Sequence, residues 1–195
     1  PMGKMAAAMA KRPQVLEAVE EPRGDGILEG VNFNSPSQTV VAGDKDAIAR
    51  FMDVAKEKKI RAKELPVGTA FHSPMMIPAA DKLKTVLKEA GLKAPNAKIY
   101  ANVTAEDMMK DFDGKDAGEY LADIMSRQAK SPVYWEETVH HFKRDGAEIL
   151  IEIGPGKTLS GLAKKTEADL KRFNIENAES LKETIEGLKA LKAEQ

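Results

Sequence analysis

Residues 26–42 read GILEGVNFNSPSQTVVA, and this stretch decides the fold of the 195-residue chain. Two strand-like runs, 26–33 and 38–42, flank Asn34-Ser35-Pro36-Ser37, whose residue types favour a turn. The pattern therefore predicts a β-hairpin.

A helix and a strand are predicted on each side of this hairpin. An apolar strand at 4–9 and a helix at 13–21 precede it. After it, Asp44 is suited to cap a helix that runs to residue 58, and residues 61–67 return as a strand. The order β-α-β-β-α-β is the split pattern of a ferredoxin-like unit.

The rest of the chain alternates between strand and helix patterns. Strands are predicted at 98–103 and 148–153, and helices at 78–90, 117–128, 131–146, 159–165 and 180–192, the last with a capping box at Ser180 and Glu183. Such alternation implies a parallel sheet covered by helices. Two strands do not complete such a sheet, so either residues outside this sequence complete it or the interpretation is wrong.

Composition excludes several classes of function. Thirty basic and 31 acidic residues leave a formal net charge of −1, so we expect neither a nucleic-acid partner nor an anionic membrane partner. The chain has no cysteine, which excludes disulfides, thiolate metal sites and cysteine nucleophiles and fits a cytoplasmic location. No apolar run approaches the roughly 18 residues of a membrane span. We expect no metal site.

One histidine lies in a segment suited to chemistry. Residues 65–76 read LPVGTAFHSPMM and place His72 just after an apolar stretch bracketed by prolines. A histidine with a pKa of roughly 6.5 can take and return a proton at neutral pH if a nucleophile is within reach. If this segment is considered alone, the competing interpretation is that His72 is a structural histidine on a loop.

Six motifs together resemble the malonyl-CoA:acyl-carrier-protein transacylase family over nearly the whole chain. They occur in the family's order: GKMAAAMA, VNFNSPSQTVVAG, LPVGTAFHSPMM, NVTAE, SRQAKSPVYWEETV and EIGPGKTLSGLAKK. The chain resembles the family's C-terminal part. The resemblance implies an α/β fold class, with a ferredoxin-like subdomain at 1–66 and the C-terminal part of an α/β-hydrolase-like domain at 67–195.

The resemblance also implies roles for individual residues. His72 matches the general base, and the main-chain carbonyl of Gln128 matches the group that orients its ring. Phe71 matches the bulky residue that favours malonyl over methylmalonyl groups, a steric preference of about 1–3 kcal/mol. Asn32 and Asn34 match a turn near the cleft, although a hairpin turn alone would explain both.

A partner and a pathway are implied in the same way. The family moves the malonyl group from malonyl-CoA to the phosphopantetheine thiol of acyl carrier protein by ping-pong transfer, in fatty-acid or polyketide synthesis, without a cofactor. The docking surface for the acidic carrier protein is matched by the stretches that contain Arg61, Lys164 and Lys165. Basic residues there would attract the acidic carrier electrostatically. Ordinary surface positions are the alternative for each.

The sequence departs from the family in one respect. The family's nucleophile is the serine of a G-x-S-x-G elbow, and these 195 residues contain no such motif. We therefore expect the chain alone to be inactive. Three alternatives stay open for the family's N-terminal half: it is a separate chain, it was lost in the organism, or it was left out of this sequence. The alternative function is a non-catalytic fragment or a module that binds carrier protein.

Two further signals carry no prediction of a site. Gly156-Lys157-Thr158 ends like a phosphate-binding P-loop, but Ile151 stands where that motif needs glycine. The adjacent pair His140-His141 would point about 100° apart on a helix and could not share a metal ion.

Overall fold

The computed structural model describes residues 3–193, so the first two residues of the predicted domain 1–66 and the last two of the predicted domain 67–195 lie outside the described part. The chain divides into two compact units, Pro1–Thr138 and Val139–Gln195, which are described separately. The domain boundary predicted after residue 66 lies inside the first unit.

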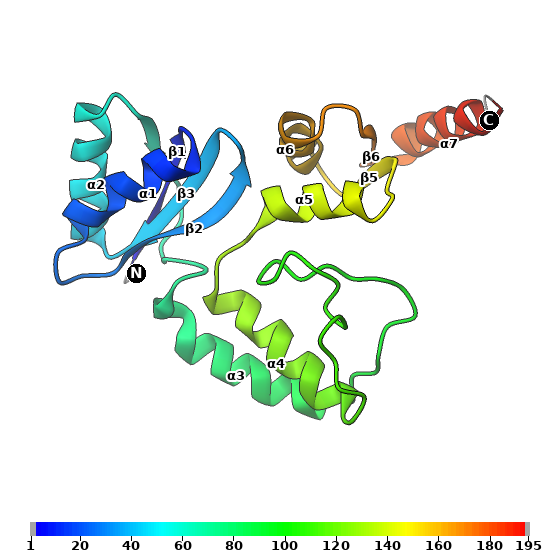
Figure 1. Ribbon diagram of the computed structural model, residues 1–195, viewed down its shortest axis with the longest axis horizontal. Coiled ribbons are helices and arrows are strands. Elements are labelled where there is room, and N and C mark those ends of the chain that lie inside the picture. Colours follow the sequence, from blue (N-terminus) through cyan, green and yellow to red (C-terminus); the bar gives the residue numbers. More distant parts are fainter. Residues whose placement is uncertain (1–2, 194–195) are drawn as a thin grey trace. The chain divides into compact units, whose positions relative to one another are not determined.

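A four-stranded antiparallel sheet organises the first unit (Figure 1). The strand order is β2-β3-β1-β4, and the chain order is β-α-β-β-α-β, as the sequence pattern predicts. The elements are β1 (Lys4–Met9), α1 (Arg12–Arg23), β2 (Leu28–Ser35), β3 (Gln38–Gly43), α2 (Lys45–Glu57) and β4 (Arg61–Glu64). The strand predicted at 61–67 ends early because Pro66 has no N–H to donate.

Helices α1 and α2 cover one face of this sheet. As predicted, Asp44 caps α2, because its Oδ1 accepts the N–H of Ala47 at 2.8 Å. Its Oδ2 accepts the N–H of Ile27 at 3.0 Å, which ties the helix start to the chain before β2. The core between helices and sheet consists of Ala6, Ala8, Val15, Ala18, Val19, Leu28, Val41, Ala47, Ile48, Phe51 and Ala55.

The segment that contains His72 covers the opposite face of the sheet. Four of its apolar residues, Leu65, Val67, Ala70 and Met75, pack on Met5, Ala7, Val31, Val40 and Ala42 of the strands. Ala70 is fully buried there. A Cβ atom at Gly3 would lie 2.8 Å from the Ala70 backbone nitrogen, so this close approach requires glycine. The sheet thereby fixes the chain two residues before His72.

A helical hairpin completes the first unit. The short helix η1 (Pro74–Met76) leads into α3 (Ile77–Glu89), which packs along α4 (Ala117–Lys130). The prediction of a strand at 98–103 is wrong. Ala101 and Val103 instead pack with Leu121 and Ile124 of α4, so the alternation of apolar residues reflects a loop that covers a helix.

The segment before α5 (Trp135–Arg144) is extended, so the helix predicted from residue 131 begins later. The N–H of Val133 donates to the carbonyl of Val31 at 2.7 Å, and the N–H of Phe33 donates to the carbonyl of Val133 at 2.9 Å. These two bonds attach Val133 to the outer edge of β2 and hold it out of a helical conformation.

The second unit contains a sheet of two parallel strands. β5 (Ile149–Ile153) pairs with β6 (Lys171–Ile175), and α6 (Thr158–Thr166) and α7 (Ala178–Ala193) complete the unit. Strand β6 was not predicted, because KRFNI begins with two charged residues and has only two apolar ones.

Helix α7 begins before the predicted capping box. Asn177 is its cap, because the Asn177 Oδ1 accepts the N–H groups of Glu179 at 3.0 Å and Ser180 at 2.9 Å. On this helix Leu181 is 43% exposed, while Thr184 is buried. Gly187 brings α7 so close to β6 that a Cβ atom there would overlap the ring of Phe173.

We expect the two sheets to differ in local stability. Two-stranded sheets are marginal by themselves, and Ile151 and Ile153 on β5 are 41% and 79% exposed. Amides of β5 and β6 should therefore exchange with solvent faster than those of β1 and β3 when the 195-residue chain is followed by hydrogen exchange. Equal protection in a monodisperse monomer would contradict this expectation.

Candidate functional site

His72 lies in a sharp turn between the sheet and η1. The hydroxyl of Ser73 donates to the carbonyl of Ala70 at 2.6 Å and accepts the N–H of Met75 at 3.3 Å. Ser73 is fully buried, so these bonds form in the interior. They fix the chain immediately before and after the histidine.

The backbone of His72 is in the left-handed region, with φ at 60°. Residues other than glycine rarely adopt this conformation, and its cost is of order 1–3 kcal/mol. The His72 N–H donates to the carbonyl of Ala129 at 3.2 Å, which helps to hold the turn against α4. A strained residue with a titratable side chain indicates a functional position.

The imidazole ring of His72 is held by the end of α4. Its Nδ1 lies 2.9 Å from the carbonyl oxygen of Gln128. Because a carbonyl oxygen can only accept, this contact requires the proton on Nδ1 and leaves the lone pair on Nε2 to take up another proton. Gln128 and Ala129 belong to the last turn of α4, where helix carbonyls have no partner within the helix.

The Gln128 side chain makes a second connection. Its Oε1 accepts the N–H of Asn102 at 3.0 Å, and the Asn102 carbonyl accepts the N–H of Tyr134 at 3.0 Å. No pattern in the sequence marks Asn102 as a functional residue, although it lies in the NVTAE motif. The Asn102 Nδ2 is buried without a hydrogen-bond partner among residues 3–193.

Phe71 lies beside the histidine and outside the core. Its side chain is 41% exposed, whereas the phenylalanine of α2, Phe51, is fully buried. Packing in a core therefore does not explain a large ring at position 71.

Asn32 of the hairpin lies on the sheet face that the His72 segment covers. A β-bulge between Gly30 and Asn32 shifts the register so that Asn32 pairs with Val40, whose side chain belongs to that face. The Asn32 Oδ1 is buried and has no hydrogen-bond partner within the described part of the chain. Asn34 donates through Nδ2 to the Oε1 of Gln38 at 3.1 Å, across the turn.

The sequence and the fold both match known acyltransferases. The family model described as acyl transferase domain matches residues 2–192. The chain belongs to the acyl transferase domain family.

Curated relatives of this acyl transferase domain carry malonyl transacylase names. The malonyl CoA-acyl carrier protein transacylase of Bacillus subtilis is 34% identical over 190 residues, which cover 96% of this chain and 58% of the relative. The chain spans little more than half the length of the curated relatives that it matches.

Solved structures of the same class share the fold. The malonyl CoA-acyl carrier protein transacylase of Clostridium perfringens matches with a TM-score of 0.90 and 33% identity, over 98% of this chain and 59% of that chain. A malonyl-transacylase in complex with its type II PKS acyl-carrier protein matches with a TM-score of 0.85 and 33% identity, over 95% of this chain and 59% of that chain.

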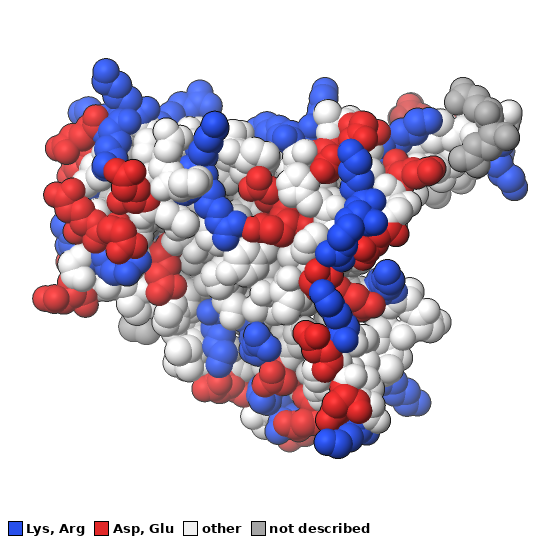
Figure 2. All heavy atoms as spheres, viewed as in Figure 1, with Lys and Arg blue, Asp and Glu red and all other residues white. Residues whose placement is uncertain are grey.

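The three basic residues predicted to dock a carrier lie on exposed parts of this acyl transferase domain. Arg61 is on β4 of the first unit, and Lys164 and Lys165 are in the last turn of α6 in the second. On the face shown in Figure 2, positive and negative side chains are interspersed.

Glu152 of β5 occupies the start of α6 in this domain. Its two carboxylate oxygens accept the N–H groups of Leu159 at 3.1 Å and Ser160 at 2.8 Å. Burial raises the pKa of Glu152, but hydrogen bonds from the Ser160 side chain and from the N–H groups of Ser160 and Leu159 outweigh burial and hold the pKa of the carboxyl below its ordinary value. A carboxylate thus fills the position that a phosphate would need at Gly156-Lys157-Thr158.

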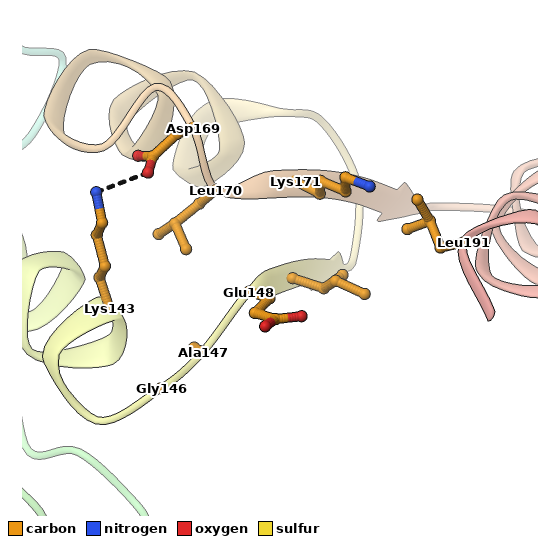
Figure 3. Close-up of a pocket in the computed structure, with 9 residues that line it drawn as sticks. Lys143, Gly146, Ala147, Glu148, Asp169, Leu170, Lys171 and Leu191 are labelled. Carbon is orange, nitrogen blue, oxygen red and sulfur yellow. Dashed lines mark ion pairs between the residues drawn. The ribbon is translucent and has the colours of Figure 1, made fainter. Parts of the chain in front are cut away.

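A hollow of about 520 Å³ lies at the amino ends of β5 and β6 (Figure 3). On one side Lys143 pairs with Asp169 at 2.7 Å and with Glu167 at 2.8 Å, and these hydrogen bonds raise the pKa of Lys143. His140 also reaches Glu167, at 2.6 Å. The lining residues are Lys143, Gly146, Ala147, Glu148, Ile149, Asp169, Leu170, Lys171 and Leu191.

The described part of the chain lacks two kinds of feature. Within residues 3–193, no helix is long and apolar enough to cross a membrane. The same residues contain no group of three or more histidine, cysteine, aspartate or glutamate side chains arranged to hold a metal ion.

Proposed function

We propose that the chain supplies the histidine base of a malonyl-CoA:acyl-carrier-protein transacylase. The reaction is transfer of the malonyl group from malonyl-CoA to the phosphopantetheine thiol of acyl carrier protein. The observation that carries the proposal is the contact between His72 Nδ1 and the Gln128 carbonyl, in a member of the acyl transferase domain family. This contact leaves His72 Nε2 able to accept a proton.

In the first half-reaction, Nε2 takes the proton from the serine hydroxyl as that oxygen attacks the malonyl thioester carbonyl. The serine belongs to a G-x-S-x-G elbow that these 195 residues do not contain. When the C–S bond breaks, the imidazolium returns the proton to the CoA sulfur, and the malonyl group remains on the serine.

The second half-reaction repeats these steps with the carrier's thiol. Nε2 takes the thiol proton, the sulfur attacks the acyl-serine, and the proton returns to the serine oxygen. The imidazolium of both half-reactions is stabilised at Nδ1 by the Gln128 carbonyl dipole instead of a carboxylate.

Phe71, Asn32 and Asn34 form the proposed substrate surface. The exposed Phe71 ring, next to the base, would crowd an α-methyl group and favour malonyl over methylmalonyl substrates. The buried and unpaired Asn32 Oδ1 supports a polar contact from the adjacent sheet face. The bond from Asn34 to Gln38 gives Asn34 a role in shaping the turn.

Acyl carrier protein is the proposed partner. A similar malonyl-transacylase has been solved in complex with its carrier protein, which supports an equivalent complex here. Arg61, Lys164 and Lys165 are exposed cations that would steer an acidic carrier.

We also propose a domain organisation and a location for the protein. Residues 1–66 correspond to a ferredoxin-like subdomain, supported by the sheet order β2-β3-β1-β4. Residues 67–195 correspond to the C-terminal part of an α/β-hydrolase-like domain. A cytoplasmic location is consistent with the lack of cysteine.

A labelling experiment tests the function. The 195-residue chain alone should remain unlabelled by radioactive malonyl-CoA. A fusion protein, in which the unmatched N-terminal part of the Bacillus subtilis relative precedes residues 1–195, should form acyl-enzyme and transfer the label to acyl carrier protein. Stable acylation of the 195-residue chain would refute the assigned division of roles.

The same experiment addresses the alternative function. A fusion protein that binds carrier protein without becoming labelled would favour a carrier-binding module over an enzyme. That outcome would be interpretable only if the intact Bacillus subtilis relative were labelled under the same conditions.

A further inference from the structure

The Gln128 side chain takes part in no step of the proposed reaction. The Gln128 carbonyl that receives His72 Nδ1 belongs to the last turn of α4. Carbonyls at a helix end have no helical hydrogen bond to fix their direction. Another contact must therefore restrain the peptide group that orients the histidine.

The Gln128 side chain provides such a contact. Its Oε1 accepts the N–H of Asn102 at 3.0 Å, so one residue binds His72 through its main chain and the 90–116 loop through its side chain.

The loop end of this connection is itself restrained. Ala101 is fully buried and packs with Leu121 and Ile124 of α4. The Asn102 carbonyl accepts the N–H of Tyr134 at 3.0 Å, just after the Val133 segment that is attached to β2. The Asn102 N–H is therefore a donor held from both sides, and it can fix the Gln128 side chain in position.

We propose that the Gln128 side chain is a positioning residue for the base: by binding the Asn102 N–H, it holds the Gln128 carbonyl where it keeps the His72 proton on Nδ1. This inference rests on the proposed function, because it concerns the base of that reaction. It predicts that removing the side-chain acceptor weakens the tautomer preference of His72 while the carbonyl itself remains present.

The test measures the tautomer of His72 in the 195-residue chain by ¹⁵N NMR, as a function of pH. The chain has three histidines, and a His72→Ala sample assigns the signals. Gln128→Leu removes the acceptor at similar size, and Gln128→Asn is too short to reach the Asn102 N–H. Gln128→Glu keeps an acceptor. We expect Gln128→Leu and Gln128→Asn to lower the ratio of Nδ1–H to Nε2–H tautomer about fivefold, and Gln128→Glu to keep it.

Gln14→Leu is the matched control. The Gln14 Oε1 also accepts a backbone N–H, that of Lys11 at 3.2 Å, at the start of α1. This control should lower the melting temperature without changing the His72 tautomer.

The inference is overturned if Gln128→Asn or Gln128→Leu keeps the wild-type tautomer ratio, or if Gln128→Glu loses it. Gln128→Asn decides the question if Gln128→Leu does not fold. The measurement needs no turnover, so its outcome is separate from the labelling of the fusion protein, which tests the proposed function.

Discussion

Replacing His72 with alanine in the fusion protein is expected to lower the transfer rate by roughly three to six orders of magnitude, the range for losing the base of a Ser-His system. Without Nε2 at this position, nothing takes the serine proton during attack or returns a proton to the departing sulfur. The loss should appear in kcat, because the imidazole acts in the transition state. Steady-state kinetics with malonyl-CoA and acyl carrier protein measure it.

His140→Ala is the control for this prediction. His140 is a partly exposed histidine of the second unit, paired with Glu167 at 2.6 Å, and the proposed reaction does not use it. Its replacement should leave kcat within a few-fold of the starting value. A His72→Ala fusion protein with undiminished kcat would remove His72 from the mechanism.

Substitution by alanine at two phenylalanines should change the stability of the chain by very different amounts. Phe51 is fully buried beneath the sheet, and Phe51→Ala is expected to lower the free energy of unfolding by about 3–5 kcal/mol, because it deletes a buried ring and leaves a cavity. Phe71 is 41% exposed and lies next to the base, so Phe71→Ala should change stability far less. Denaturant unfolding of the 195-residue chain measures both.

Substrate selectivity, in contrast to stability, should change at Phe71. Phe71→Ala in the fusion protein should raise the kcat/KM for methylmalonyl-CoA relative to malonyl-CoA by about 10-fold or more, since a single methyl group is worth roughly 10–200-fold in a close-fitting pocket. An unchanged ratio would exclude Phe71 as the residue that discriminates. A loss of stability at Phe71 as large as that at Phe51 would show that the ring packs in a core.

The sequence predicted the first sheet well because local signals agree with one another there. The turn at Asn34-Ser35-Pro36-Ser37, the Asp44 cap and the apolar residues of α2 all act within a few positions. The strand at 98–103 failed because its apolar alternation serves packing on α4. The strand β6 was missed because KRFNI begins with two charged residues and so lacks a local apolar signal.

Less of the candidate site than of the first sheet could be predicted from the residues alone. One histidine in an unusual segment was visible in the residues, but its orientation by Gln128 came from the family resemblance. The bond from Gln128 to Asn102 joins positions 26 residues apart through a side chain and a backbone N–H. No periodicity or spacing rule reports such a contact. The same holds for the bulge that turns Asn32 toward the covered face of the sheet.

The left-handed backbone at His72 has a consequence for protein engineering. Glycine adopts this conformation without the steric penalty of a Cβ atom, so a screen that rewards heat resistance alone would enrich glycine at position 72. Such a screen would select the most durable chains and discard the base in the same step. A thermostable library of this domain must therefore hold position 72 constant.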